Sequence, residues 1–316
     1  MKTDVYFAKK DNKMIIAYMN DKQQEVFLGV SRYDFAPFFS KALVFDSSVV
    51  IENILIKGFE YTIIEKKEMD VGVKFKNIWK PFIQENVTKE LNFNVPILYQ
   101  AKRNLSILIQ KLQEILLFVE PSPKCLQTYS HKIKELLILS CTELENSFKF
   151  YQFGKNERTS DYVKILDFVD LSKYSISLIG YADAFKSYPF KTWNKKQPTK
   201  SLPWYEAYTE IKHNSSENFQ SATLEHCLNA IMANIIMFAI RYSVKHLYTN
   251  ADVYSSLIST HFDFKIENSL DFYIPLIECQ PAPPYPEQPY FINDKFIGTE
   301  LVGFLIQHPY EERPIK

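Results

Sequence analysis

The chain has 316 residues, of which 46% are hydrophobic and 15% aromatic, and Lys plus Arg balance Asp plus Glu at 37 each. This composition excludes a disordered chain and supplies enough apolar material for two domains, and zero net charge excludes a general basic field for nucleic acid or membranes. The N-terminal sequence MKTDVYFAKK lacks the apolar core of a signal peptide, and the apolar run 231–240 is shorter than the roughly 20 residues that span a bilayer. We therefore expect a cytoplasmic protein with no membrane partner.

Residues 1–95 carry the pattern of a strand-rich region. Short β-branched or aromatic runs, such as MIIAYM, EVFLGV and SVVIENILI, are separated by polar stretches such as NDKQQ. This alternation predicts an antiparallel sheet, with a hairpin from Lys13 to Glu25 that turns at Asn20 and Asp21. Two interpretations stay open: a separate small β domain, or a sheet that packs against the helices that follow.

From about residue 96, apolar residues recur every three or four positions, which is the period of helices. The expected helices cover residues 98–119, 130–151, 161–171 and about 218–248. Residues 173–193 between them have an irregular or partly stranded pattern. The run 231–240, in which only Asn234 is polar, predicts a central helix that is buried on nearly all sides.

Beyond residue 250 the pattern changes again. THFDFKI and DFYIPLI alternate like strands, and QPAPPYPEQPY after them fits neither a helix nor a central strand. We interpret residues 251–316 as an acidic, proline-containing arm that docks elsewhere on the chain; the alternative is a polyproline ligand for a protein partner. The expected fold class is α+β, with an antiparallel β-rich region (1–95), an all-α bundle (96–250) and a C-terminal proline-rich arm (251–316).

Glycine and cysteine usage argues against several classes of site. The seven glycines form neither GxGxxG nor a P-loop, so dinucleotide and P-loop folds are not expected. The four cysteines, Cys125, Cys141, Cys227 and Cys279, are widely spaced without a CxxC pair, which favours reduced thiols over disulfides or a zinc site. We expect no cofactor and no metal.

The residues ahead of the central helix carry a motif. Pro189 and Trp193 are followed by Trp204, Tyr205, Tyr208, Lys212 and His213, and then by Ala222, Leu224, Leu228, Asn229 and Ala230. This spacing resembles an uncharacterised bacterial helical-domain family with a motif close to W-W-x-x-Y-N-x-x-K-H, which is similar to HEPN-type bundles. The resemblance covers about residues 125–245 and implies a HEPN-like bundle with Glu143 in the acidic position of the family.

The resemblance also implies an Arg and a His separated by four to six residues, and Arg241 and His246 have this spacing. In such a ribonuclease the His takes the 2′-hydroxyl proton and the Arg holds the phosphate as charge builds on it. A cation at a helix C-terminus is also favoured by the helix dipole alone. Arg241 and His246 are therefore either catalytic or a solvated helix end.

The second candidate site is a polar turn that holds Trp204, Tyr208, Lys212 and His213. In one interpretation Lys212 and His213 bind phosphate or contact Glu143 from the second expected helix (130–151). In the other, the aromatic rings pack into the bundle, and Lys212 and His213 satisfy buried carboxylates or carbonyls.

The expected function is that of a non-catalytic interaction module in a defence or toxin-type system. The alternative is a HEPN-like, metal-independent ribonuclease or a nucleotide-binding effector, so the sequence leaves open whether the protein is an enzyme. The candidate partners are a second copy of the chain, RNA, and a protein bound through the β region or the proline-rich tail.

Overall fold

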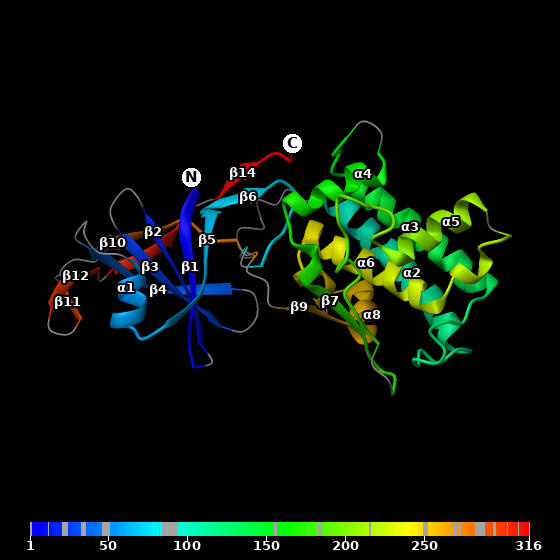
Figure 1. The fold of residues 1–316 in the computed structure, drawn as a ribbon, viewed down its shortest axis with the longest axis horizontal. Coiled ribbons are helices and arrows are strands. Elements are labelled where there is room, and N and C mark those ends of the chain that lie inside the picture. Colours follow the sequence, from blue (N-terminus) through cyan, green and yellow to red (C-terminus); the bar gives the residue numbers. More distant parts are fainter. Residues whose placement is uncertain are drawn as a thin grey trace. The chain divides into compact units, whose positions relative to one another are not determined.

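The computed structural model describes residues 2–11, 13–20, 25–32, 36–45, 51–81, 83, 94–154, 157–182, 185–214, 216–248, 252–267, 271, 273–281, 288–292, 295–301, 303–308 and 310–315. Its internal contacts divide the chain into two compact units. The β unit comprises residues 1–74, 81–90 and 272–313, and the helical unit comprises residues 75–80, 91–271 and 314–316. Figure 1 shows both units and labels most of their elements.

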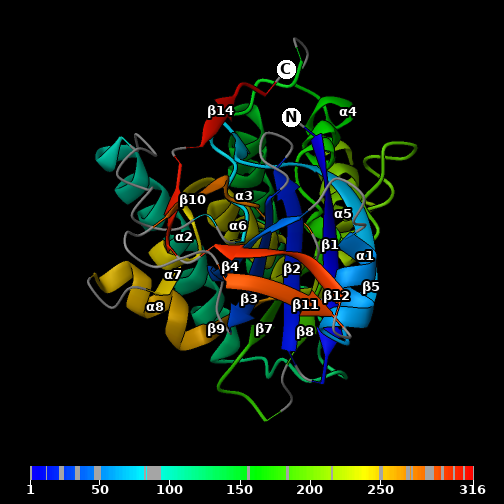
Figure 2. The same ribbon diagram turned by 90° about the vertical axis from the view of Figure 1, so that its left-hand side faces the viewer.

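The β unit is built on a seven-stranded sheet in the order β11-β12-β4-β3-β2-β1-β5 (Figure 2). Its strands are β1 (Lys2–Lys10), β2 (Lys13–Asn20), β3 (Glu25–Arg32), β4 (Ala36–Phe45), β5 (Thr62–Asp70), β11 (Gln288–Ile292) and β12 (Lys295–Leu301). All neighbouring strands are antiparallel. Because β12 pairs with β4, strands from both ends of the chain complete one sheet.

Both faces of this sheet are covered. On one face, α1 (Ile51–Asn53) and the π-helical turn η1 (Ile54–Gly58) pack Ile51, Ile54 and Leu55 against strand residues such as Tyr6 and Leu43. On the other face, the buried Tyr18 hydroxyl donates to the Pro275 carbonyl at 2.8 Å and accepts from the Ile277 amide at 3.1 Å. Two small sheets complete the pairing: β10 (Ile277–Pro281) with β13 (Gly303–Gln307), and β6 (Val73–Phe75) with β14 (Glu311–Arg313).

The helical unit packs its helices around α6. The helices are α2 (Val95–Leu116), α3 (His131–Lys149), α4 (Thr159–Tyr162), α5 (Pro203–His213), α6 (Leu224–Tyr242), α7 (Lys245–Tyr248) and α8 (Val253–His261), with 3-10 turns η3 (Val163–Asp167), η4 (Leu171–Lys173) and η5 (Phe219–Ser221). α6 contacts α2, α3, α5 and α7. A three-stranded antiparallel sheet of β8 (Lys186–Ser187), β7 (Tyr174–Leu178) and β9 (Phe262–Ile266) belongs to the same unit (Figure 1).

α6 is the core of the helical unit. The Thr223 hydroxyl accepts from the His226 amide at 3.2 Å and caps the start of the helix. The Asn234 side chain inside it is buried and donates to the carbonyls of Ser140 and Ala230 at 2.8 Å each, so its polarity is satisfied. Within the described residues α6 is the one helix long and apolar enough to cross a membrane, and 78% of that stretch is buried, as in the core helix of a globular unit.

The expected fold class is wrong. Strands are spread through the chain, so there is no β-rich region followed by an all-α bundle with an arm. β7 and β8 lie inside the part (96–250) that was expected to be all helical, and they form a sheet with β9 from the expected arm. Residues of the expected arm supply β11 and β12 to the large sheet. The sequence pattern failed here because alternation marks strands but does not name the strand with which each one pairs.

Three local expectations also need correction. The expected helix 218–248 ends at Tyr242, because Ser243 has a φ of +80° and turns the chain before α7. The run SVVIENILI forms α1 and η1 over its described residues. The expected polar turn at Trp204 to His213 is the helix α5. The expected turn residue Asp21 and residues 282–287 of the proline-rich stretch lie outside the described residues.

Candidate functional site

The candidate site residues lie in separate places of the helical unit. Tyr208, Lys212 and His213 line a cavity of about 610 Å³, called here the α5 cavity. Arg241 and Glu143 line another cavity, of about 380 Å³, called here the Arg241 cavity. Trp204 and His246 line neither of them.

Helix α5 presents one face to the core and its last turn to the α5 cavity. Pro203 occupies the first turn, where a missing amide hydrogen costs nothing. Trp204 is 3% exposed, and its indole nitrogen donates to the Pro189 carbonyl at 2.9 Å, so it anchors the helix. Tyr208 and Lys212 are four residues apart and therefore lie on the same side of the helix.

The α5 cavity is lined by polar and charged side chains from α3, α4, α5 and the residues just before α4. They include Glu145, Lys149, Glu157, Arg158, Tyr205, Tyr208, Lys212 and His213. The Lys212 ammonium donates to the Tyr208 hydroxyl at 3.2 Å. This hydrogen bond and the charge of Glu145 raise the pKa of Lys212, so it stays cationic at neutral pH.

The carboxylates of this cavity are engaged by their own neighbours. Glu145 accepts from the Tyr205 hydroxyl at 2.9 Å, and Glu157 lies 3.8 Å from the Lys149 ammonium. Within the described residues, neither Lys212 nor Arg158 has a carboxylate within ion-pair distance. Burial raises the pKa of Tyr208, so its hydroxyl is neutral and able to donate or accept. The cavity thus holds cationic groups that an anion could pair with.

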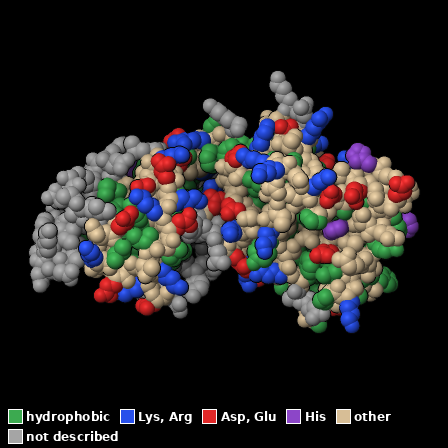
Figure 3. Space-filling view, in the orientation of Figure 1, with side chains coloured by type: hydrophobic (Ala, Val, Ile, Leu, Met, Phe, Trp, Pro, Cys, Tyr) green, Lys and Arg blue, Asp and Glu red, His purple; other side chains and the backbone are tan. Residues whose placement is uncertain are grey.

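The charge of the α5 cavity is a local feature. On the face drawn in Figure 3, Lys and Arg side chains are interspersed with Asp and Glu over the helical unit. Together with the zero net charge of the chain, this mixture argues against a strong field of one sign on this face, where an anion is recognised by short-range contacts.

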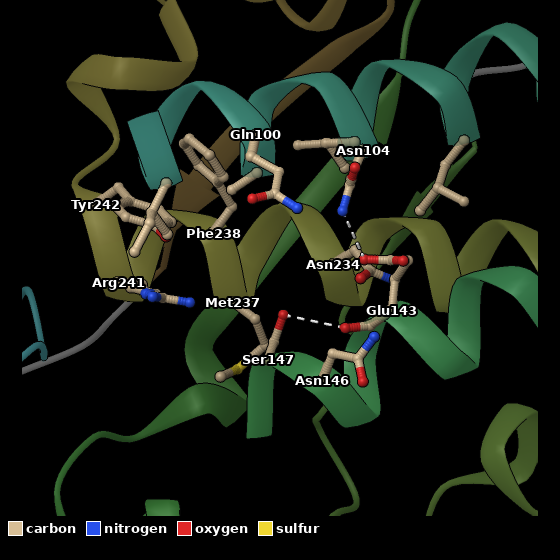
Figure 4. A pocket seen from close by; sticks show the side chains of 14 residues that line it. Gln100, Asn104, Glu143, Asn146, Ser147, Asn234, Met237, Phe238, Arg241 and Tyr242 are labelled. Carbon is tan, nitrogen blue, oxygen red and sulfur yellow. Dashed lines mark hydrogen bonds between the residues drawn. The ribbon is translucent and has the colours of Figure 1, made fainter. Parts of the chain in front are cut away.

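The Arg241 cavity lies among α2, α3 and α6 (Figure 4). Its polar lining comprises Gln100, Asn104, Glu143, Asn146, Ser147 and Arg241. Leu105, Leu108, Met237 and Phe238 contribute apolar walls. The Asn104 amide donates to Glu143 Oε2 at 3.1 Å.

Arg241 is stacked against aromatic rings. Its guanidinium carbon lies 3.3 Å from the centre of the Phe150 ring and 4.8 Å from that of Tyr242. Burial lowers the pKa of Arg241. The guanidinium still remains charged at neutral pH, because the ordinary pKa of an arginine side chain lies far above that pH. His246 follows the turn at Ser243, in α7, and its carbonyl accepts from the Ser255 hydroxyl at 2.9 Å. His246 is therefore not among the residues that line the Arg241 cavity.

The structure adds residues to the α5 cavity that the sequence interpretation missed, above all Glu145 and Arg158. Glu143 was expected beside Lys212. Residues two positions apart on a helix point about 200° apart, and it is Glu145 that faces the α5 cavity, whereas Glu143 faces the Arg241 cavity. The sequence spacing could have indicated this, because Glu145 and Lys149 are four residues apart and therefore share one face of the helix.

The described residues contain no group of three or more His, Cys, Asp and Glu side chains that could hold a metal ion. The four cysteines are free thiols, and burial raises the pKa of both Cys141 and Cys227. Buried, protonated thiols of this kind are poor nucleophiles.

Comparisons with protein-family models, curated proteins and solved structures found no match to this chain. The resemblance to HEPN-type bundles therefore rests on the quoted motif residues alone. The function proposed below rests on the side chains that line the two cavities.

Proposed function

We propose that the helical unit is a non-catalytic binding module and that the α5 cavity takes a phosphate-bearing ligand of nucleotide size. The observation that supports this most is the pair of cations, Lys212 and Arg158, that line one cavity without a carboxylate partner among the described residues. Lys and Arg are the side chains that hold phosphate groups by charge-assisted hydrogen bonds.

Two further features fit such a ligand. The volume of about 610 Å³ lies within the range of small-molecule sites, roughly 300 to 1,000 Å³. Tyr205 and Tyr208 line the same cavity, where they are only 5% and 3% exposed, so they meet a ligand through their hydroxyls rather than through stacking faces. Tyrosine hydroxyls at the same wall can hydrogen-bond a sugar or a base edge.

A ribonuclease is the less favoured candidate. Its expected pair, Arg241 and His246, is split between the end of α6 and the separate helix α7. General base and phosphate clamp have to reach the same group of the substrate, so this separation argues against catalysis by these two residues. The homodimer, the RNA or protein partner and the cytoplasmic location stay predictions.

Calorimetric titration of the purified full-length protein with AMP, adenosine and inorganic phosphate tests the proposal. AMP should bind, and Lys212→Ala should weaken it about tenfold or more, since a hydrogen bond to a charged group contributes about 1.5–3 kcal/mol. Adenosine, which lacks the phosphate, should be insensitive to this substitution. Lys196→Ala is the matched control, because Lys196 is exposed and lines neither cavity.

Equal AMP affinity of the Lys212→Ala protein and the wild type would overturn the assignment of the site, and so would absence of binding by all three compounds. The same preparations incubated with labelled RNA examine the other candidate. RNA cleavage that is lost in His246→Ala would replace the binding module by a nuclease.

A further inference from the structure

The Arg241 cavity contains two opposite charges that do not pair with each other. Arg241 has no carboxylate within ion-pair distance among the described residues, and Glu143 has no cation within that distance. The one recorded side-chain partner of Glu143 is the Asn104 amide. Removing charges partly from water without a counter-charge is unfavourable, so both are positioned to receive one from a ligand.

Arg241 is held in a fixed orientation. The guanidinium lies over the rings of Phe150 and Tyr242, and its N–H groups make no hydrogen bond to another described residue. In Figure 4 its side chain extends from the end of α6 toward the cavity. A planar guanidinium presented by its edge matches the two oxygens of a carboxylate.

The two charges are too far apart for a ligand with adjacent charges. Glu143 precedes Phe150, the residue that caps the end of α3 and on which Arg241 stacks, by seven residues, so the backbones at these two positions lie about 10 Å apart at a rise of about 1.5 Å per residue. An α-amino acid, whose ammonium and carboxylate share one carbon, does not reach across this interval. An extended chain of two amino acids spans about 7 Å, which leaves room for one hydrogen bond at each end.

The wall between the charges suits a peptide group. Gln100, Asn104 and Asn146 line it with side-chain amides, and those of Gln100 and Asn146 make no hydrogen bond to another described residue. Amides carry both donors and acceptors, as does the peptide bond that they would meet. Met237 and Phe238 supply apolar surface for a side chain.

We propose that the Arg241 cavity is a binding site for a short zwitterionic peptide of dipeptide size, with its carboxylate on Arg241 and its ammonium on Glu143. The volume of about 380 Å³ accommodates such a molecule. This site is separate from the α5 cavity and shares no lining residue with it. The two ligands can therefore be tested independently.

Titration of the full-length protein with alanyl-leucine and three relatives tests the proposal. The relatives are the N-acetylated dipeptide, the dipeptide amide and free leucine. The unmodified dipeptide should bind at least tenfold more tightly than each of the three, because every relative lacks one charge or the required length. Weaker or equal binding of the unmodified dipeptide would overturn the proposal.

Two variants assign each end of the ligand. Arg241→Gln should weaken the unmodified dipeptide at least tenfold but leave the dipeptide amide unchanged, since the amide has no carboxylate to lose. Glu143→Gln should do the same for the ammonium, with the N-acetylated dipeptide unchanged. Arg103→Gln on the exposed side of α2 is the control and should bind as the wild type does.

Arg241→Lys guards against a folding defect, because it keeps the charge and the stem of the side chain. It should bind the unmodified dipeptide more tightly than Arg241→Gln, and unchanged tryptophan fluorescence should show that all variants are folded. Discrimination between the unmodified and amidated dipeptides that survives in Arg241→Gln would refute the role of Arg241.

Discussion

Replacing Asp252 by Ala would leave the Lys102 ammonium buried without its counter-charge. Lys102 on α2 is 3% exposed, and its nitrogen lies 2.5 Å from Asp252 Oδ2 and 2.9 Å from the Ser255 hydroxyl. Asp252 also begins α8, because its other oxygen accepts from the Ser255 amide at 2.9 Å. One side chain thus joins α2 to α8 and caps α8.

Breaking a buried ion pair on one side costs about 3–5 kcal/mol, and loss of a helix cap costs about 1 kcal/mol. Asp252 is 15% exposed, so water reaches part of the site and the lower half of this range applies. The lower end of the ion-pair range, about 3 kcal/mol, plus the cap gives an expected loss of about 4 kcal/mol in the free energy of unfolding. With a denaturant slope of about 2 kcal/mol per molar, the urea midpoint falls by about 2 M.

Tryptophan fluorescence measures this unfolding selectively. Trp79, Trp193 and Trp204, which are 4%, 6% and 3% exposed, are the three tryptophans of the chain, and all belong to the helical unit. In the double variant Lys102→Met with Asp252→Ala no charge is left unpaired, so only the cap is lost and the midpoint should fall by about 0.5 M. A single variant as stable as the double one would refute the reasoning.

Two further predictions concern pH and the β unit. Burial tends to raise the pKa of Asp252, but hydrogen bonds from Lys102 and Ser255 outweigh burial and lower the pKa. The stabilising effect of Asp252 is therefore complete above its unfolded-state pKa of about 3.9 and is lost as pH falls through the lower folded-state pKa. Thermal melts should show the difference in stability between the wild type and Asp252→Ala closing as pH falls below about 4. In the β unit, Tyr18→Phe removes the acceptor of the Ile277 amide and the donor to the Pro275 carbonyl, so hydrogen exchange at Ile277 should accelerate at least tenfold, and unchanged exchange would contradict this.

Parts of the fold follow from local patterns, and these parts were predictable. The apolar period expected over 98–119 and 130–151 corresponds to α2 and α3, because helices of this length bury one face repeatedly. The runs MIIAYM and EVFLGV lie in β2 and β3, which are paired as a hairpin. The formation of such helices and hairpins depends on residues close together in the sequence, so the sequence of one chain is enough to predict them.

Other parts depend on contacts between distant residues or on single backbone angles. The pairing of Gly298 with Phe45 in the large sheet joins the two ends of the chain, and no spacing in the sequence indicates it. The end of α6 depends on Ser243, which has a φ of +80°. Serine rarely adopts a positive φ, so the residue type does not predict this turn. SVVIENILI is rich in β-branched residues, yet Ile51, Ile54 and Leu55 have helical spacing and pack under the sheet.

The candidate site was predictable to the extent that it follows helical spacing. Tyr208 and Lys212 meet because they are four residues apart in α5. The partition of Glu143 and Glu145 into different cavities requires the orientation of α3, which only the packing around α6 determines. Residue type and spacing therefore indicated Lys212 and Glu143 as candidate site residues, but not which other residues line the same cavity.

Arg241 is difficult to explain by packing alone. It follows an apolar run in α6, the most buried of the described helices, where a leucine would bury more surface and leave no charge to be solvated. The cation–π interaction with Phe150 offsets only about 0.5–2 kcal/mol of the free energy lost when the guanidinium is partly desolvated. A cation placed in a cavity at such a cost, opposite an unpaired carboxylate, is the arrangement expected where the missing counter-charges arrive with a ligand.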